Sequence, residues 1–165
     1  MSLEMMLELV ETLENPFSRT QPEAHFTGSA LVVDPSIRLT CLVHHRALDR
    51  WLQPGGHMDP SDGGRIEHTA LREAAEETGC EVDLHPDADR PFDVDVHEIE
   101  ARGAVPAHLH LDVRFLVVAD DPDVAQHRED EAHALSWLTL DEAEEQCDDE
   151  SITRMLEKVR ALAGS

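Results

Sequence analysis

Hydrophobic residues recur along the chain at two different periods, which predict where its helices and strands lie. Helical spacing near the start predicts an amphipathic helix over about residues 2–14. Alternating or continuous apolar runs predict strands over 26–33, 39–44 and 108–118, with a short edge strand over 135–138. The first two strands are close enough in sequence to form a hairpin.

Helical spacing returns in the middle and at the end of the chain. Residues 65–78 place apolar positions among charges at helical intervals, and Gly79 follows as a C-terminal stop. A last helix is expected over about 140–162, with Thr139 as its N-cap and a break near 148–149. Strands mixed with three helical segments predict an α/β (α+β) sandwich.

Length and composition fit one domain spanning residues 1–165. The sequence is 41% hydrophobic, which is enough for a core without cross-links. Its three cysteines, Cys41, Cys80 and Cys147, are odd in number and widely spaced, which argues against a disulfide framework or zinc site and favours a reducing cytoplasm. No apolar run approaches the ~20 residues that span a bilayer, so we expect no membrane partner.

The charge of the chain restricts its partners. Thirteen basic and 36 acidic residues give a formal net charge of −23. Such a field repels polyanions over about a Debye length, ~8 Å at physiological salt, which argues against a nucleic-acid polymer. A small phosphorylated substrate stays compatible with this charge, provided that cations bridge carboxylates to phosphates.

One acidic segment carries a candidate metal site. Glu73, Glu76 and Glu77 stand at i, i+3 and i+4, so on a helix they share one face. Their repulsion weakens the helix unless a hard divalent cation takes them as oxygen ligands. Arg72 can pin one of the carboxylates, and the carbonyl of Gly56 in the upstream glycine loop can join a metal shell. The alternative is a solvated acidic helix face.

The same segment, residues 56–80, resembles the Nudix box, Gly-x5-Glu-x7-Arg-Glu-U-x-Glu-Glu-x-Gly-U, in which U is a bulky apolar residue. The match runs from Gly56 through Arg72-Glu73 and Glu76-Glu77 to Gly79. The resemblance covers about residues 26–145. It implies an α/β/α sandwich with a mixed central sheet and a hydrolase of phosphoanhydride bonds.

Three departures from the box stand out. The spacing from Gly56 to Arg72 is two residues longer than in the family, and Gly64 stands where the first Glu is expected. Asp62 is the nearest acid able to replace that Glu, and Glu67 lies one turn before the arginine. The two bulky apolar positions hold smaller residues, Ala74 and Cys80.

The resemblance implies that magnesium, with manganese as a substitute, binds Glu76 and Glu77 with help from Glu73 and the Gly56 carbonyl. The ions would clamp the diphosphate of a nucleoside diphosphate linked to another moiety, or of a nucleoside triphosphate, and lower the pKa of a bound water. The general base would be Glu73 or an acid of the 128–131 loop. That loop offers Glu129 and Glu131. The family also allows a homodimer.

Several further residues are candidates for binding the substrate. A Pro-Gly-Gly-His loop and a later His-x-His-x-Asp strand resemble a largely uncharacterised Nudix subgroup in which the position of Asp62 is typically acidic. His108 and His110 would point to the same side of a strand, towards phosphate, metal or merely a polar face. The substrate-binding candidates are Arg46, His57, Asp62, His108 and His110.

Two other functions are compatible with the same fold. A binding module that recognises a nucleotide without turnover is favoured by Gly64 and opposed by the intact glutamates. A prenyl-diphosphate isomerase would need a cysteine in a pocket, and neither Cys41 nor Cys80 has that setting. Trp51 and Phe115 are expected in the core rather than under a nucleobase. Arg114 either pairs with its neighbour Asp112 or contacts a ligand.

Overall fold

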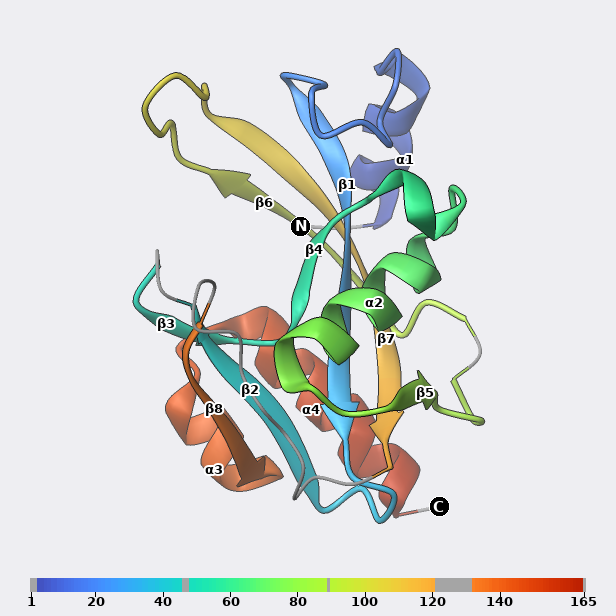
Figure 1. Cartoon of the computed structure of the whole chain (residues 1–165), viewed down its shortest axis with the longest axis vertical. Helices are drawn as coiled ribbons and strands as arrows, with labels where there is room; N and C mark the ends of the chain where they lie inside the picture. The colour runs from blue at the N-terminus through green and yellow to red at the C-terminus, as the bar shows by residue number, and fades with distance from the viewer. Residues whose placement is uncertain (1–2, 46–47, 89, 121–131, 165) are drawn as a thin grey trace.

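One mixed sheet with helices on both of its faces organises the chain (Figure 1). The computed structural model describes residues 3–45, 48–88, 90–120 and 132–164. Its elements in chain order are α1 (Leu3–Thr12), β1 (Ala24–Val33), β2 (Leu39–His45), β3 (Arg50–Leu52), β4 (Gly55–His57), η1 (Pro60–Asp62), α2 (Ile66–Thr78), β5 (Val82–Leu84), β6 (Asp93–Ile99), β7 (His108–Ala119), β8 (Ala132–Thr139), α3 (Leu140–Gln146) and α4 (Glu150–Ala163).

The sheet is centred on β1 and β7, which run parallel over the whole length of β1. The other edge of β1 has two antiparallel neighbours. The middle of β1 pairs with β4, and the end of β1 pairs with β2. The strands β5 and β6 pair with β7, and β3 and β8 pair with β2. Along this edge of β1 the sheet therefore has two separate partner strands, β4 and β2.

Apolar side chains on the two faces of the sheet form two hydrophobic clusters. Alternate residues of β1 and β7 face the first cluster, which also holds the buried alanines of α2, Ala70 and Ala74. The second cluster contains Ile152, Met155 and Leu156 of α4, all fully buried. Burying each such large side chain stabilises the fold by about 1.5–3 kcal/mol before entropy is counted. The α/β/α sandwich is confirmed.

The expected helices and strands are present, but two strands differ from the expectation. The predicted loop 54–57 contains a short strand, β4, because its glycines let it approach β1 closely enough to pair. The edge strand β8 is longer than expected. The expected break in the C-terminal helix separates α3 from α4 at 147–149, and Thr139 caps α3 with a reciprocal contact to Glu142.

Three further properties bear on the earlier expectations. Cys41, Cys80 and Cys147 are all buried, and none of them forms a disulfide. Trp51 and Phe115 pack in the hydrophobic clusters, as expected. Within the described part of the chain, no helix combines the length and apolar character needed to cross a lipid bilayer.

Candidate active site

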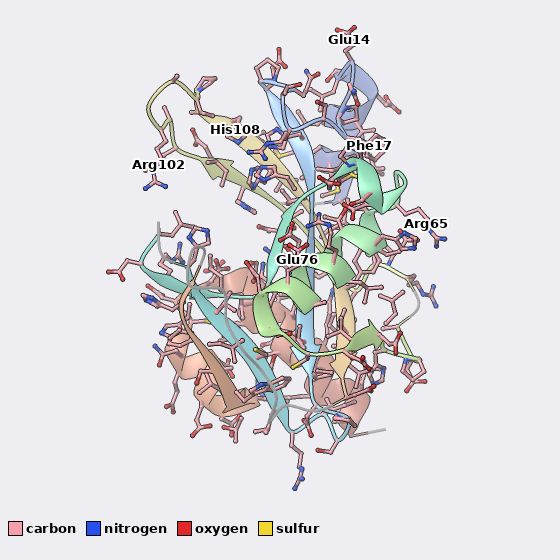
Figure 2. All side chains as sticks on the ribbon, in the orientation of Figure 1. Glu14, Phe17, Arg65, Glu76, Arg102 and His108 are labelled. Atoms are coloured by element: carbon pink, nitrogen blue, oxygen red, sulfur yellow. The ribbon has the colours of Figure 1, made fainter. Side chains whose placement is uncertain are left out.

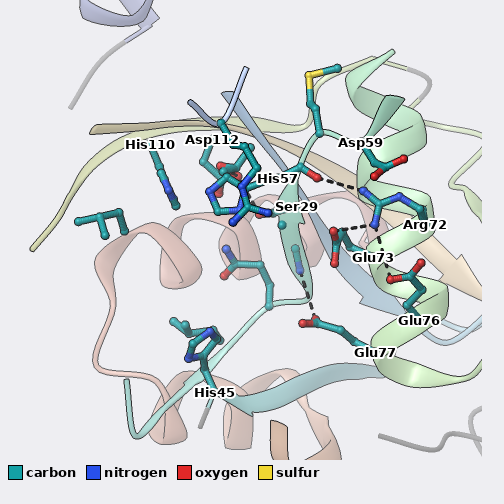
Figure 3. Close-up of a pocket in the computed structure, with 18 of the residues that line it drawn as sticks. Ser29, His45, His57, Asp59, Arg72, Glu73, Glu76, Glu77, His110 and Asp112 are labelled. Carbon is teal, nitrogen blue, oxygen red and sulfur yellow. Dashed lines mark hydrogen bonds and ion pairs between the residues drawn. The ribbon is translucent and has the colours of Figure 1, made fainter. Parts of the chain in front are cut away.

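Helix α2 directs the acidic residues of the predicted site into the main pocket of the molecule. Glu73, Glu76 and Glu77 all line this pocket, which has a volume of about 1380 Å³ (Figure 3). Glu77 is buried, whereas the side chain of Glu76 is 40% exposed. The predicted clustering of the three carboxylates on one side of the helix is therefore present in the structure.

The glycines of β4 allow the strand to lie directly against these carboxylates. A Cβ on Gly56 would collide with the carboxylate of Glu73, and a Cβ on Gly55 would collide with Ser29. The Gly55 N–H donates a hydrogen bond of 3.3 Å to Oε2 of Glu77. A side chain at Gly55 would push against the backbone of β1, and one at Gly56 would displace the Glu73 carboxylate. The backbone of β4 therefore forms one wall of the acidic cluster.

Arg72 connects the acidic cluster to the loop before the helix. Its Nη1 donates to Oε1 of Glu73 at 2.7 Å and lies 3.6 Å from Oε2 of Glu76. Its Nη2 donates to the carbonyl of His57 at 3.0 Å. The guanidinium therefore fixes both the first carboxylate of the cluster and the end of β4.

Asp62 takes the place expected for the missing first glutamate of the box. It accepts Nε and Nη2 of Arg72 at 2.9 and 3.0 Å, together with the Thr69 hydroxyl and the Asp59 N–H at 2.8 Å each. Burial would raise the pKa of Asp62, but these hydrogen bonds outweigh it and hold the pKa at about 2. The hydrogen bonds that Arg72 donates to Asp62 in turn raise the pKa of the Arg72 guanidinium. Because Asp62 is only 3% exposed, its position favours bracing over substrate contact.

The two extra residues of the box form the turn that places Asp62. Asp59 accepts the Ser61 N–H at 2.9 Å and thereby caps the short helix η1. Gly63 and Gly64 follow with φ of 65° and 75°, which few side chains tolerate. A side chain on Gly64 would meet nothing within 4 Å. The other acid considered, Glu67, accepts a hydrogen bond of 2.7 Å from Arg65 instead.

The opposite wall of the pocket comes from β1 and β7. Asp112 accepts the hydroxyls of Thr27 and Ser29 at 2.9 and 2.7 Å. It also accepts Nε of Arg114 at 2.6 Å, and Arg114 lies within 4 Å of Asp93 and Asp95. Arg114 is thus a buried partner of its neighbour Asp112, which settles the two alternatives in favour of the salt bridge.

The three predicted histidines meet at one end of this wall, together with His25, which sequence reasoning missed. The ring of His25 lies 5.0 Å from that of His57, 4.9 Å from that of His108 and 5.1 Å from that of His110. His57 and His110 line the pocket, whereas His108 lies beyond its lining. His25 is the register partner of His110, a relation that no local pattern reveals.

Burial keeps His25, His57 and His110 neutral at ordinary pH. Burial first, and then the neighbouring imidazoles, lower the pKa of His110 to about 2 and that of His57 to about 4. Burial also lowers the pKa of His25. The imidazoles therefore offer lone pairs rather than positive charge.

Three predicted site residues lie outside the described part of the chain, and several residues of the pocket were not predicted. Arg46, Glu129 and Glu131 lie outside the described residues. Arg19 and Arg102 line the pocket, and no sequence pattern singled them out. The half-exposed ring of Phe17 also lines it. In the view of Figure 2, Arg102 and Phe17 lie on opposite sides of Glu76.

Comparison with known proteins identifies the class of this fold and site. The family model of the NUDIX domain matches residues 25–159. The chain therefore belongs to the Nudix family. The predicted resemblance is confirmed, and the family match spans all four residues that form the acidic site and its arginine. No curated protein matched the sequence.

Solved structures of Nudix hydrolases share the fold. An Ap4A hydrolase from C. elegans superimposes with a TM-score of 0.65 at 22% identity, covering 85% of this chain and 98% of its own. A NUDIX family hydrolase from Clostridium perfringens gives 0.66 at 18% identity, with 84% and 97% covered. The E. coli dihydroneopterin triphosphate pyrophosphohydrolase gives 0.60 at 14% identity, with 81% and 92% covered.

Proposed function

We propose that this Nudix hydrolase uses magnesium to cleave a phosphoanhydride bond in a nucleoside diphosphate linked to another moiety, or in a nucleoside triphosphate. The observation that carries the proposal is the convergence of Glu73, Glu76 and Glu77 in one pocket, against the glycine strand β4. The ion pair between Arg72 and Asp62 braces these carboxylates.

The donor set of this pocket fits a hard divalent ion. Three carboxylates provide oxygen ligands, and Gly56, which has no Cβ and so lets its backbone lie against the Glu73 carboxylate, can add its carbonyl. When bound, magnesium or manganese supplies a Lewis acid for the phosphate oxygens and lowers the pKa of the attacking water. We therefore assign Glu76 and Glu77 as principal ligands, with Glu73 and the Gly56 carbonyl completing the set.

The protein groups position the reaction and receive its proton. Arg72 holds the Glu73 carboxylate and the end of β4 in a fixed relation, so the ligands need little rearrangement when the substrate enters. Among the described residues, Glu73 is the general-base candidate; the alternatives Glu129 and Glu131 lie outside them. The water oxygen attacks one phosphorus of the phosphoanhydride, the bridging P–O bond breaks, and the other phosphate leaves with the bridging oxygen. The base accepts the proton of the water, and two phosphorylated products are released.

The substrate class follows from the pocket and from the charge of the chain. Two of the structural neighbours are hydrolases of Ap4A and of dihydroneopterin triphosphate, both small phosphorylated molecules. Arg19 and Arg102 are placed to meet phosphate charge. The net charge of −23 disfavours nucleic-acid polymers. Three cysteines without a disulfide are compatible with the proposed reducing cytoplasm. A homodimer is a further proposal, which a measurement of the oligomeric state in solution would test.

Metal removal tests the proposed reaction directly. Protein treated with a chelator is expected to lose hydrolysis of a panel of nucleoside triphosphates, nucleotide sugars and dinucleoside polyphosphates. Added magnesium or manganese restores it, because the carboxylates alone cannot neutralise a diphosphate. Product release followed by chromatography is the measurement, and an unchanged circular dichroism spectrum is the control. Full activity without any divalent ion would contradict the proposal.

Phe17 is proposed to stack on the nucleobase. It is 51% exposed and stacks on Phe26 with ring centroids 5.1 Å apart. Among the described residues that line the pocket, it is the only Phe, Tyr or Trp. Phe17→Ala is expected to raise KM about tenfold with little change in kcat, since stacking of a base contributes about 1–3 kcal/mol.

Phe17→Leu separates stacking from packing in the same steady-state assay. Leucine keeps apolar contact with Phe26 but has no ring face. A KM near that of Phe17→Ala supports stacking, whereas a wild-type KM in the Leu variant would assign Phe17 to packing alone.

The two competing functions are less well supported by the structure. The binding-module hypothesis depended on the loss of the first box glutamate, but Asp62 supplies the brace at that place. The isomerase hypothesis needs a cysteine in the pocket, yet both candidates lie in the hydrophobic core. Cys41 is fully buried, and Cys80 is 3% exposed. Hydrolysis therefore accounts for more of the site.

A further inference from the structure

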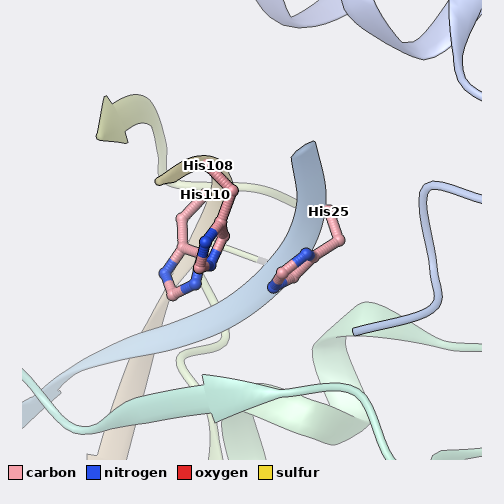
Figure 4. Close-up of side chains that lie close together, drawn as sticks. All are labelled: His25, His108 and His110. Atoms are coloured by element: carbon pink, nitrogen blue, oxygen red, sulfur yellow. The ribbon is translucent and has the colours of Figure 1, made fainter. Parts of the chain in front are cut away.

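Three histidines from two neighbouring strands form a compact group that the hydrolase chemistry leaves unexplained. His25 of β1 and His110 of β7 are register partners, and His108 lies two residues before His110 on the same side of its strand. One ring nitrogen from each of the three lies within 4.8 Å of the others. Figure 4 shows the His25 ring directed towards the other two.

Hydrogen bonds to backbone carbonyls fix which nitrogen is available on two of these rings. Nδ1 of His25 lies 3.1 Å from the Gln21 carbonyl, and Nδ1 of His108 lies 2.9 Å from the Pro106 carbonyl. A carbonyl only accepts, so each neutral ring carries its proton on Nδ1 and leaves the Nε2 lone pair free. Metal-binding histidines are commonly oriented in this way.

Two of the nitrogens in the group have no partner of their own. Nε2 of His25 and Nε2 of His110 are inaccessible to solvent and form no hydrogen bond in the structure. The His25 residue as a whole is only 3% exposed. Buried polar atoms are nearly always satisfied, so two adjacent exceptions point to a missing ligand.

We propose that His25, His108 and His110 bind one zinc-type divalent ion through their Nε2 atoms. Three imidazole ligands with an open fourth position are typical of zinc, and imidazole nitrogens suit Zn²⁺ far better than Mg²⁺. Zn–N distances of about 2.0–2.1 Å require the rings to draw together by about 1 Å. This site is separate from the glutamates and goes beyond the proposed hydrolysis.

The position of His57 relates the zinc site to the pocket. Its ring lies 5.0 Å from those of both His25 and His110, and it lines the pocket. The open position therefore adjoins the space that holds the substrate. The alternative, a cationic histidine cluster that binds phosphate without metal, is disfavoured because burial lowers the pKa of His110 to about 2.

Cobalt binding to untagged, metal-free protein tests the proposal. Titration with Co²⁺ is expected to give one equivalent of visible absorption with the high intensity typical of four-coordinate sites, displaced by Zn²⁺ but not by Mg²⁺. His108→Ala is expected to weaken binding at least about tenfold. His44→Ala is the matched control, because His44 lies beside Trp51 outside the group, and it should bind as the wild type does.

A Glu76→Gln, Glu77→Gln double variant separates this proposal from the hydrolase. It should lose hydrolysis and keep the cobalt spectrum. A spectrum lost with the glutamates but retained in His108→Ala would overturn the zinc site, as would phosphate binding to the metal-free histidines with no Co²⁺ absorption. Should His108→Ala fail to fold by circular dichroism, anomalous scattering from zinc-soaked wild-type crystals decides. A peak between the three rings supports the site, and a peak only at the glutamates overturns it.

Discussion

Glu77→Gln is expected to lower kcat at least about 100-fold while the protein stays folded. Glu77 is only 6% exposed, and its Oε2 accepts the Gly55 N–H at 3.3 Å. Glutamine keeps the size of the side chain and the oxygen that accepts this hydrogen bond. It removes the negative charge that a divalent ion requires, so chemistry suffers more than structure. Glu76→Gln is expected to have an effect of similar size for the same reason.

Steady-state kinetics at saturating magnesium measure this effect. Glu67→Gln is the matched control, because it makes the same change on the same helix, where Glu67 contacts Arg65 and does not line the pocket. Its kcat should stay near that of the wild type. Values of kcat near that of the wild type in both Glu76→Gln and Glu77→Gln would contradict a role of the acidic cluster in the reaction.

Asp62→Asn is expected to lower the free energy of unfolding by about 2–3 kcal/mol at pH 7 and kcat by about 10- to 100-fold. The aspartate accepts two hydrogen bonds from Arg72 while almost fully buried. The neutral amide leaves the guanidinium without its main counter-charge. Arg72 then holds Glu73 and the end of β4 less firmly, so both stability and catalysis decline.

The same variant has a predictable dependence on pH. The pKa of Asp62 lies at about 2 in the folded protein, below its ordinary value of 3.8. A lowered pKa stabilises the fold above the unfolded pKa, and this contribution is lost as the pH falls towards the folded pKa. The difference in stability between wild type and Asp62→Asn should therefore be constant above about pH 5 and narrow below about pH 4.

Urea unfolding at a series of pH values measures this difference. Asp83→Asn is the control, because Asp83 is exposed on β5, and its stability should stay within about 0.5 kcal/mol of the wild type. A constant gap between Asp62→Asn and wild type down to pH 3 would contradict the assigned ion pair. An unchanged kcat in the destabilised variant would show that the contact between Asp62 and Arg72 stabilises the fold without contributing to catalysis.

Local sequence patterns were sufficient for most elements and for the acidic half of the site. The glutamates and Arg72 lie on one helix, so their common side follows from helical geometry alone. The strand β7 was equally readable, because its alternation turns into a continuous apolar run where it enters the core. The helix caps followed from Thr139 and Gly79, which act on their immediate neighbours.

Relations between distant segments were beyond that reasoning. Asp62 was recognised as a candidate to replace the first glutamate of the box. Its contact with Arg72, however, depends on the turn through Gly63 and Gly64, which the sequence pattern did not predict. His25 carries no local signal, and only the parallel pairing of β1 with β7 brings it to His110. The strand character of residues 55–57 likewise depends on pairing with β1.

By itself, the sequence determined which residues share a helix face, because consecutive residues of a helix have fixed relative directions. It therefore determined the acidic cluster, while the resemblance of residues 56–80 to the Nudix box indicated the family. The tertiary structure alone decided which strands are neighbours and in what register, since register is set by packing across the whole sheet. That packing brings the histidines together and buries Asp62 under Arg72, so the second half of the site exists only in the folded chain.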